Sequence, residues 1–499
     1  MFRLFSREST LRLLIFGGVA LGVPGAALLA QEWVVEPSAV YSSSEASGYQ
    51  YELAPNAVPW SQNADEESNV VEDEDAVDDS AKIEELEQRL DKLTADFKAE
   101  QEKNKKKEKL TDPYNLKFGG FLGLGAYYVS QDDVSKDLLG NAKNVYDVHD
   151  LRFTCRGNGH GMQFAAGVGV QESIKLYDNY VRFKDSPIFG DITIGHFYVE
   201  SGMESIEPAF EPAFISTDEG ASFFRMNRRL GIGSTNYNAE KTARLFLGIF
   251  AAPSVNTWPN RTENEDPGYL LNTRLTAAPI LVEDDKGFTR EVLHFGGSFY
   301  WLDPTSDDSS LTLKTRGHGW VGNSPYFING KISLEDRSYS VSQMEIAYQR
   351  EGFAATADGY VMSITNGGGN AYGSTAAMRW CLTPGCTRSY NKNDARFTTM
   401  NMPEEAIFVN FDKRGRGQGF GALEAVVKWE YLETDDVNFT SVDPTTGTVN
   451  RVVTGANWWW NQQTCLAFNW EHAVANVEKG AKSGDAKNDS CFLQMGVKF

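Results

Sequence analysis

The chain has 499 residues, 46 glycines, 12% aromatic residues and a formal net charge of -21 at pH 7, with a mean hydropathy of -0.40. This charge argues against a nucleic-acid partner because phosphates would repel the protein. Beyond the N-terminal region no apolar run is long enough to predict a transmembrane helix, so a membrane-spanning form of this chain would have to be a β-barrel.

Residues 1–30 are predicted to be a cleaved signal peptide. Arg3, Arg7 and Arg12 precede an apolar run from Leu13 to Leu29, which the small residue Ala30 follows. This order of charged, apolar and small residues is typical of secretory signals. The alternative is a single membrane anchor, but several glycines and one proline interrupt the run, which favours cleavage and export.

Residues 31–79 are predicted to be an acidic disordered linker. Every charged residue from Gln31 to Ser80 is acidic, and the segment Val71–Asp79 is the densest part. A segment of this composition cannot bury enough apolar surface to fold alone. The acidity of the chain therefore says more about this linker than about the predicted barrel.

Residues 80–110 are predicted to form a short α-helical coiled coil. Ile83, Leu86, Leu90, Leu93 and Phe97 are spaced by 3, 4, 3 and 4 residues, which is the spacing of a heptad seam. We interpret the segment as a periplasmic oligomerisation stalk. The alternative is one solvated amphipathic helix, because the seam is short.

Residues 114–499 are predicted to be an all-β domain, a transmembrane antiparallel β-barrel of about 16 strands with short turns on one side and longer loops on the other. The clearest predicted strands are Leu116–Val129, Met162–Gln171, Asp191–Glu200, Arg228–Tyr237, Ala243–Ala252, Tyr269–Leu281, Val292–Leu302, Met344–Arg350, Phe353–Ile364, Gly373–Leu382, Gly419–Leu432, Cys465–Val474 and Cys491–Phe499.

The last of these strands alternates up to the C-terminal residue. Leu493, Met495, Val497 and Phe499 fall on one face, as expected for a strand that contacts lipid on one side and a polar lumen on the other. A terminal aromatic residue also resembles the assembly signal of bacterial outer-membrane barrels. A large soluble β-solenoid or a pair of β-sandwiches is the alternative, and the signal peptide together with Phe499 argues against it.

Four segments of the predicted barrel have the form of known motifs. They are Phe189-Gly-Asp-Ile-Thr-Ile-Gly-His-Phe197, Trp380-Cys-Leu-Thr-Pro-Gly385 followed by Arg388-Ser-Tyr390, Gly417-Gln-Gly-Phe-Gly-Ala-Leu-Glu424 and Asn457-Trp-Trp-Trp-Asn461. These segments resemble motifs of the phosphate-selective porin O and P family, and the resemblance covers roughly residues 116–499. The resemblance implies a sixteen-stranded homotrimeric porin in the outer membrane of a Gram-negative-type bacterium. It also implies an inward-folded third loop, a basic lumen that conducts small anions such as phosphate, and no cofactor.

The alternation of the strands predicts which bases line the lumen, because a residue between two lipid-facing neighbours faces inward. These bases are Arg152, Arg182, Arg229, Arg244, Arg274, Arg379 and Lys428. Lys314 and Arg316 lie where the family has a basic loop segment. Basic side chains in a pore lower the barrier for anions. The alternative is that a polar lumen needs charges of both signs in any case.

The predicted third loop, Ser201–Met226, carries mostly acids. They are Glu204, Glu207, Glu211, Asp218 and Glu219, and Arg225 is its only base. Acids on this loop opposite bases on the wall predict a transverse field, which serves general diffusion of polar solutes. In addition, Tyr198-Val199-Glu200 replaces the lysine-glutamate-proline that often follows this motif in the family, which weakens the expectation of phosphate selectivity.

The five cysteines offer one candidate disulfide. Cys381 and Cys386 flank the turn Pro384-Gly385, and the alternative is two free thiols. No cysteine or histidine spacing predicts a metal site. The glycine-rich segment Gly157-Asn-Gly-His160-Gly is expected in a hairpin turn with no helix after it, so it does not predict a phosphate-binding loop or an enzyme.

Two functions remain from the sequence. The first is a passive porin for small polar solutes with a preference for anions such as phosphate. The second is a structural outer-membrane protein that contacts the cell wall or its neighbours through the N-terminal segment. In that case the third loop, the long loop Asp303–Ser340 and the loop Gly367–Ala371 would fill the lumen, and conduction would be negligible.

Overall fold

The computed structural model describes residues 88–89, 91–92, 94–95, 98, 114–170, 174–207, 213–215, 223–252, 268–304, 310–315, 325–410 and 415–499. The chain divides into two units, Met1–Glu85 and Leu86–Phe499. The predicted signal peptide and acidic linker lie outside the described residues. The described residues between 88 and 98 are helical, but the five seam residues of the predicted coiled coil are outside them.

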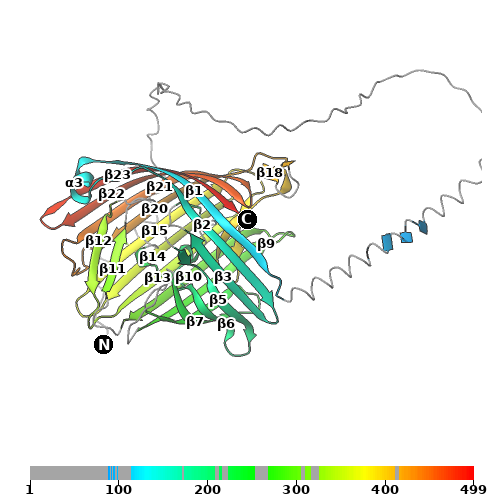
Figure 1. The fold of residues 1–499 in the computed structure, drawn as a ribbon, viewed down its shortest axis with the longest axis horizontal. Helices are drawn as coiled ribbons and strands as arrows, with labels where there is room; N and C mark the ends of the chain where they lie inside the picture. The colour runs from blue at the N-terminus through cyan, green and yellow to red at the C-terminus, as the bar shows by residue number, and fades with distance from the viewer. Residues whose placement is uncertain are drawn as a thin grey trace, which may run out of the picture. The chain divides into compact units, whose positions relative to one another are not determined.

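The main element is a closed antiparallel barrel of 16 strands, as the sequence predicted (Figure 1). The wall strands are, in chain order, β1 (Lys117–Gln131), β2 (Val145–Gly159), β3 (Met162–Val170), β4 (Ile174–Leu176) continued by β5 (Asn179–Ser186), β6 (Gly190–Tyr198), β7 (Arg228–Tyr237), β8 (Ala243–Ala251), β9 (Tyr269–Glu283), β10 (Thr289–Asp303), β13 (Tyr339–Arg350), β14 (Phe353–Ile364), β15 (Gly369–Cys381), β20 (Ala422–Glu433), β21 (Thr445–Asn461), β22 (Thr464–Lys479) and β23 (Lys482–Lys498).

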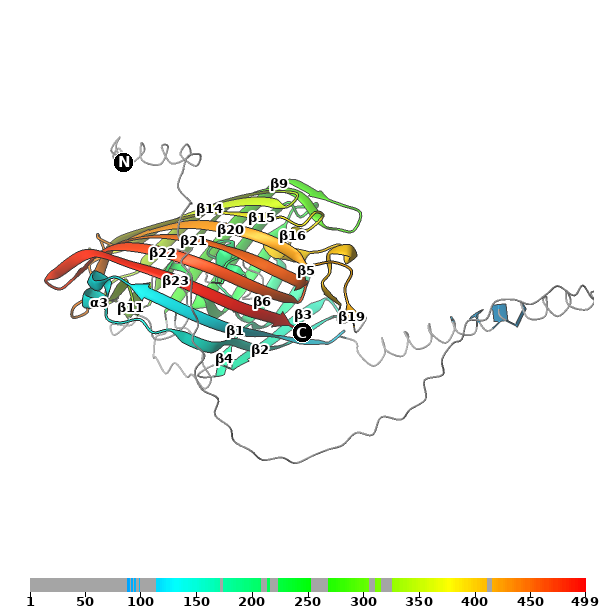
Figure 2. The same cartoon turned by 90° about the horizontal axis from the view of Figure 1, so that it is seen from above.

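The first and last strands close the barrel and lie side by side in Figure 2. β1 and β23 pair from Phe121↔Lys498 to Gln131↔Asn488. The C-terminal Phe499 extends this pairing, because its amide donates to the carbonyl of Gly120 and its carbonyl accepts from the amide of Gly120. A Cβ at position 120 would lie 2.5 Å from the Phe499 ring, so the terminal aromatic needs glycine there.

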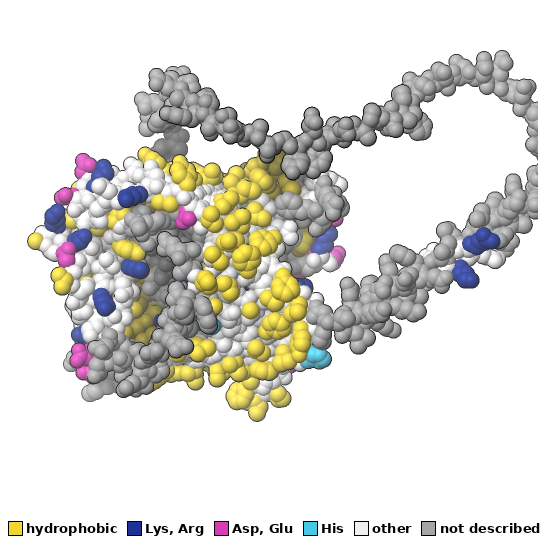
Figure 3. All heavy atoms as spheres, viewed as in Figure 1, with side chains coloured by type: hydrophobic (Ala, Val, Ile, Leu, Met, Phe, Trp, Pro, Cys, Tyr) yellow, Lys and Arg dark blue, Asp and Glu magenta, His cyan; other side chains and the backbone are white. Residues whose placement is uncertain are grey.

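The outer surface carries an apolar belt because the strands alternate. On β7, the outward-facing residues Leu230 and Ile232 are 54% and 55% exposed, whereas the lumen-facing Arg229 is 9% exposed. Figure 3 shows hydrophobic side chains spread over the strands, while charged side chains gather at the end of the barrel that carries α3 (Asp133–Leu139). This pattern is that of a barrel whose outer face contacts lipid.

The two ends of the barrel differ. We call the end with Lys117 and Phe499 the turn end and the opposite end the loop end. At the turn end the predicted turns after Tyr237 and after Asn461 are short, as expected. At the loop end, α3 begins at Asp132, whose carboxylate accepts the Ser135 amide at 2.7 Å. No described helix is both long and apolar enough to cross a membrane.

The long loop Asp303–Ser340 contains a hairpin of β11 (Ser310–Thr315) and β12 (Ile328–Ser333). This hairpin contacts the loop between β20 and β21, where the Thr440 amide donates to the Lys331 carbonyl at 2.7 Å and Asn329 pairs with Thr445. Its described part therefore contacts β21 and the loop before it.

The prediction of short connections throughout the turn end was wrong at one place. Between β15 and β20 the chain makes an excursion, residues 382–421, which we call the insert. It contains β16 (Thr387–Asn391), β17 (Arg396–Asn401), η2 (Glu404–Ala406), β18 (Val409–Asn410) and β19 (Gly415–Arg416). The predicted strand Gly419–Leu432 therefore begins only at Ala422. The physical reason is that polar groups of β16 and β17 bond to lumen-facing side chains, as described below.

Candidate pore lumen and its charged wall

Loop 3 connects β6 and β7, and its described residues 199–207, 213–215 and 223–227 contact inward-facing side chains of the wall. Its main chain contacts strands far apart on the wall. The Met203 amide donates to Glu345 of β13, the Tyr300 hydroxyl of β10 donates to the Phe224 carbonyl at 2.6 Å, and the Asn457 amide of β21 donates to the Ala213 carbonyl at 2.7 Å. A segment that bonds to β10, β13 and β21 must cross the barrel interior.

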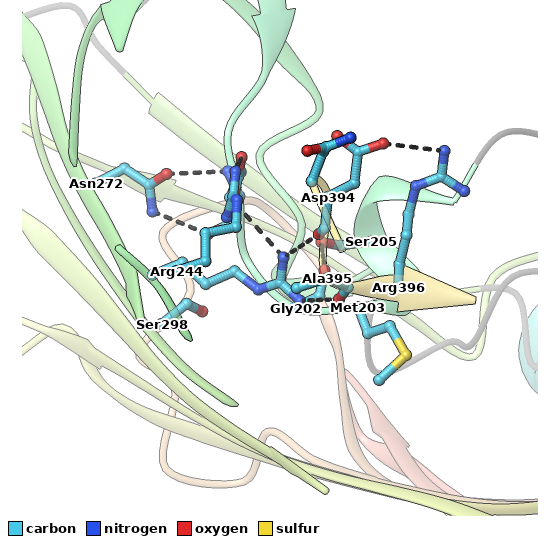
Figure 4. Close-up of polar contacts among 12 residues, drawn as sticks. Gly202, Met203, Ser205, Arg244, Asn272, Ser298, Asp394, Ala395 and Arg396 are labelled. Atoms are coloured by element: carbon cyan, nitrogen blue, oxygen red, sulfur yellow. Dashed lines mark hydrogen bonds and ion pairs between the residues drawn. The ribbon is translucent and has the colours of Figure 1, made fainter. Parts of the chain in front are cut away.

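The hairpin of the insert enters the lumen from the turn end. Arg274 of β9 donates from Nη1 to the Asp394 carbonyl at 3.0 Å and from Nη2 to the Ala395 carbonyl at 2.9 Å. Figure 4 shows the hairpin residues Asp394 to Arg396 beside Gly202 and Met203 of loop 3, with Arg244 and Asn272 of the wall opposite. Loop 3 and the insert thus meet inside the barrel.

Further contacts hold the insert against the wall. Nδ1 of His294 on β10 lies 2.7 Å from the Tyr390 hydroxyl, and the Gln349 side chain of β13 donates to the Arg388 carbonyl at 2.7 Å. At the hairpin tip, Lys392 pairs with Glu283 at 2.7 Å. These bonds use lumen-facing polar groups of the wall that would otherwise face water.

Most charges on the inner wall are paired. Arg244 contacts both carboxylate oxygens of Glu200 at 2.6 and 2.5 Å. Arg274 contacts Oε1 of Glu345 at 2.7 Å and Oε2 of Glu200 at 3.6 Å. Glu345 also lies 3.2 Å from Nε2 of His294. These groups form one network across β8, β9, β10 and β13, with its carboxylates from β13 and loop 3.

Two more networks lie on the opposite part of the wall. Arg388 of the insert is bidentate to Glu424 of β20, at 2.9 and 2.8 Å. Lys428 lies 2.7 Å from Glu430, which also pairs with Arg451 of β21. Arg451 lies 3.5 Å from Glu471 of β22. In this part of the wall, bases and acids therefore alternate on neighbouring strands and do not form the continuous row of bases that an anion path would need.

The structure divides the predicted lumen bases into two groups. Four have a carboxylate partner, and the pairs are Arg152 with Asp150, Arg244 with Glu200, Arg274 with Glu345, and Lys428 with Glu430. Within the described part of the chain, Arg182, Arg229 and Arg379 have none. Arg182 donates to Thr193 at 3.0 Å, Arg229 lies 3.4 Å from the Met226 sulfur, and the Arg379 guanidinium lies 3.9 Å from the Phe397 ring centre.

The predicted loop bases lie elsewhere. Lys314 lies on β11, where its ammonium is 5.1 Å from the Tyr326 ring centre. β11 belongs to the hairpin that contacts the loop before β21, and its backbone pairs with β12. Arg316 is outside the described residues.

The acids of loop 3 face the wall bases where they are described. Glu204 lies 3.5 Å from Lys428. Burial raises the pKa of Glu207 to about 8, and the neighbouring Glu204 carboxylate acts in the same direction. Arg225 donates to the Ser205 carbonyl at 3.5 Å. Glu211, Asp218 and Glu219 lie outside the described residues.

The sequence analysis missed the acids on the wall. Glu345, Glu424, Glu430 and Glu471 all lie on strands and point inward. The alternation that would have predicted them is present in the sequence. Glu345 is 4% exposed and lies between Met344 and Ile346, which are 77% and 43% exposed. The alternation that identified the bases also identifies these acids.

The two cysteines of the candidate disulfide are free thiols in the structure. Both belong to one buried cluster, and the Cys381 thiol donates to the Thr383 carbonyl at 3.7 Å. Cys381 ends β15 and Cys386 begins the insert. No group of three or more histidine, cysteine or acidic side chains is placed to hold a metal ion among the described residues.

A comparison with protein families identifies this arrangement. The model of the phosphate-selective porin O and P family matches residues 139–499. The chain belongs to this family. It is an outer-membrane porin, consistent with the closed 16-stranded barrel, the apolar belt and the terminal Phe499.

Solved structures with a similar fold include OmpT of Vibrio cholerae, at 9% identity and a TM-score of 0.46, with 78% of this chain and 98% of that chain covered. An anion-selective porin from Comamonas acidovorans is 10% identical, with a TM-score of 0.42 and coverage of 77% and 99%. OprB of Pseudomonas putida is 11% identical, with a TM-score of 0.46 and coverage of 79% and 96%. No curated protein matches the chain.

Proposed function

We propose that this porin conducts small polar solutes passively and prefers anions such as phosphate only weakly. The observation that carries the proposal is the division of the wall bases. Paired bases such as Arg244 and Arg274 contribute little net field, because a carboxylate lies in contact with each guanidinium. Arg182, Arg229 and Arg379 have no described carboxylate in contact with their guanidinium groups, so their charges favour anions more than those of the paired bases.

Orientation and assembly are part of the same proposal. Short connections of such barrels face the periplasm, so the turn end faces the periplasm and residues 31–110 lie there. The heptad spacing of residues 80–110 and the family resemblance support a homotrimer in which the stalks associate. The acidic linker then spans the space towards the cell wall, which is its candidate partner.

The test is the reversal potential of the protein in a planar bilayer under a salt gradient, with and without phosphate. We expect a small shift to the anion side and partial block by phosphate. The triple variant in which glutamine replaces Arg182, Arg229 and Arg379 should abolish the shift. Arg337→Gln is the control, because Arg337 lies in the loop after β12 and donates to the Ser333 carbonyl. Cation selectivity of the unmodified protein contradicts the proposal.

A structural role with little conduction is the second candidate, and the aromatic packing of loop 3 favours it. The Phe224 ring stacks on Tyr360 of β14 at 5.3 Å with an interplanar angle of 10°, and both rings are buried. With the insert held at the other end, much of the lumen is filled. A protein that inserts into bilayers but opens no conductance supports this second function.

A further inference from the structure

A small cavity lies inside the barrel, at the junction of described residues of loop 3, the wall and the insert. Its lining includes Glu207 and Phe214 of loop 3, Asp358 of β14, Arg379 of β15 and Phe397 of β17. The cavity measures about 40 Å³, which holds roughly three water molecules. We call it the junction pocket. It is bounded by the three parts of the protein that constrict the lumen.

Arg379 gives the junction pocket one positive group without a fixed partner. The central carbon of its guanidinium lies 3.9 Å from the centre of the Phe397 ring, and this cation–π contact helps to hold it in place. Its Nη2 atom is buried and has no hydrogen-bond partner in the described part of the chain. A buried guanidinium N–H that lacks an acceptor is unfavourable. A carboxylate would satisfy it with charge-assisted hydrogen bonds.

The opposite charge lies in the same pocket. Glu207 comes from loop 3 and Asp358 from β14, where its Oδ1 accepts from Gln343 at 2.9 Å. Glu207 is buried without an ion pair to a described residue, and in the empty pocket it is largely protonated at pH 7 because its pKa is about 8. An ammonium group beside it would favour the ionised form.

We propose that the junction pocket binds small zwitterions, namely amino acids of the size of glycine or alanine. The carboxylate of the solute binds Arg379, its ammonium lies towards Glu207 and Asp358, and a small apolar side chain contacts Phe214 and Phe397. The proposal rests on the porin function above, because the solute reaches the pocket through the lumen. It names the solute class that the charges of the junction pocket fit.

The charges exclude two simpler ligands. Inorganic phosphate carries only negative charge, so Asp358 and the neighbouring Glu204 would repel it while Arg379 attracts it. A simple cation would meet the same acids but also the uncompensated guanidinium. Only a solute with both charges satisfies both sides of the pocket at once.

The first experiment measures binding without conduction. Saturation-transfer NMR on the full mature protein in detergent detects L-alanine, with lactate as the probe that lacks the ammonium and isopropylamine as the probe that lacks the carboxylate. We expect a signal for L-alanine several-fold above both. Arg379→Met and Asp358→Asn should each remove it. Arg290→Met is the matched control, because Arg290 at the start of β10 pairs with Asp284 of the preceding turn and does not line the junction pocket.

Equal signals for the three probes, or equal loss in Arg379→Met and Arg290→Met, would overturn the proposal. Asp358→Asn tests the pocket from a second strand in case Arg379→Met does not assemble. A separate uptake assay with proteoliposomes and erythritol tests the pore itself. If erythritol enters only at the background rate, the porin function fails while the binding result still decides on the junction pocket.

Discussion

Nη2 of Arg274 lies 2.7 Å from Oε1 of Glu345, and this pair joins the two strands on either side of β10. The same guanidinium donates to the carbonyls of Asp394 and Ala395 in the insert. One buried arginine therefore connects the wall to the hairpin that enters from the turn end. Its paired state also explains why an inward-facing base does not imply an anion path.

Replacing Arg274 should destabilise the barrel. Arg274→Met leaves the Glu345 carboxylate buried without its main partner, and breaking a buried pair in this way costs about 3–5 kcal/mol. The measurement is the free energy of unfolding in urea with lipid vesicles present. The double variant Arg274→Met with Glu345→Leu should recover most of the loss, because it removes both charges.

The control for that experiment is Lys392→Met. Lys392 and Glu283 form an ion pair at 2.7 Å in which each side chain is 33% exposed. A pair that is exposed to this degree contributes at most about 1 kcal/mol. A loss as large in Lys392→Met as in Arg274→Met would show that the effect comes from loosening the insert and not from the buried charge.

Removing the hairpin of the insert should widen the pore. The variant replaces residues 387–401 with a short glycine-serine linker and carries Glu424→Gln, because Glu424 would otherwise lose its partner Arg388. The pairing of β15 with β20, from Tyr372↔Glu433 to Cys381↔Glu424, does not involve these residues. Single-channel conductance should rise several-fold. The change Glu424→Gln alone serves as the control, and an unaltered conductance in the deletion variant contradicts a lumenal insert.

Which features of this barrel could be predicted from the sequence depends on whether a local pattern encodes them. Alternation along a strand is local and strict. The outward-facing Leu230 and Ile232 therefore predict that Arg229 faces inward, and the same alternation places Phe499 on the closing strand. The position of the insert depends on distant groups, such as Arg274 with Ala395, and no local pattern encodes that contact. Charge pairing was missed for a different reason. Glu345 shows the same alternation as the bases, but the sequence analysis applied this pattern only to the bases and not to the acids.

Cys381 and Cys386 should form a disulfide when the protein is exposed to an oxidising periplasm. They are free here, but both lie in one buried cluster at the point where the insert leaves β15. Alkylation with and without reductant, followed by mass spectrometry, measures the pairing. Cys155, a free and half-buried thiol on β2, is the internal control that should stay reduced. Alkylation of Cys381 and Cys386 without reductant would contradict this prediction.

Ion selectivity should change between pH 7 and pH 9 because of Glu207. Its pKa is raised to about 8, so the side chain is mostly neutral at pH 7 and mostly ionised at pH 9. Ionisation adds a negative charge near Arg379, in a part of the lumen where Glu204, Arg388 and Arg396 also act on it. The sign is therefore fixed. As pH rises, the reversal potential under a salt gradient should move towards the cation side.

Glu207→Gln should abolish this movement, because the amide does not titrate in the range. The variant should behave at both pH values like the unmodified protein at pH 7. Arg379 stays charged throughout, so the anion preference that remains in Glu207→Gln reports its uncompensated charge. A reversal potential that moves equally in Glu207→Gln would assign the titration to another group. Opposite movement in the unmodified protein would contradict an inward-facing carboxylate on loop 3.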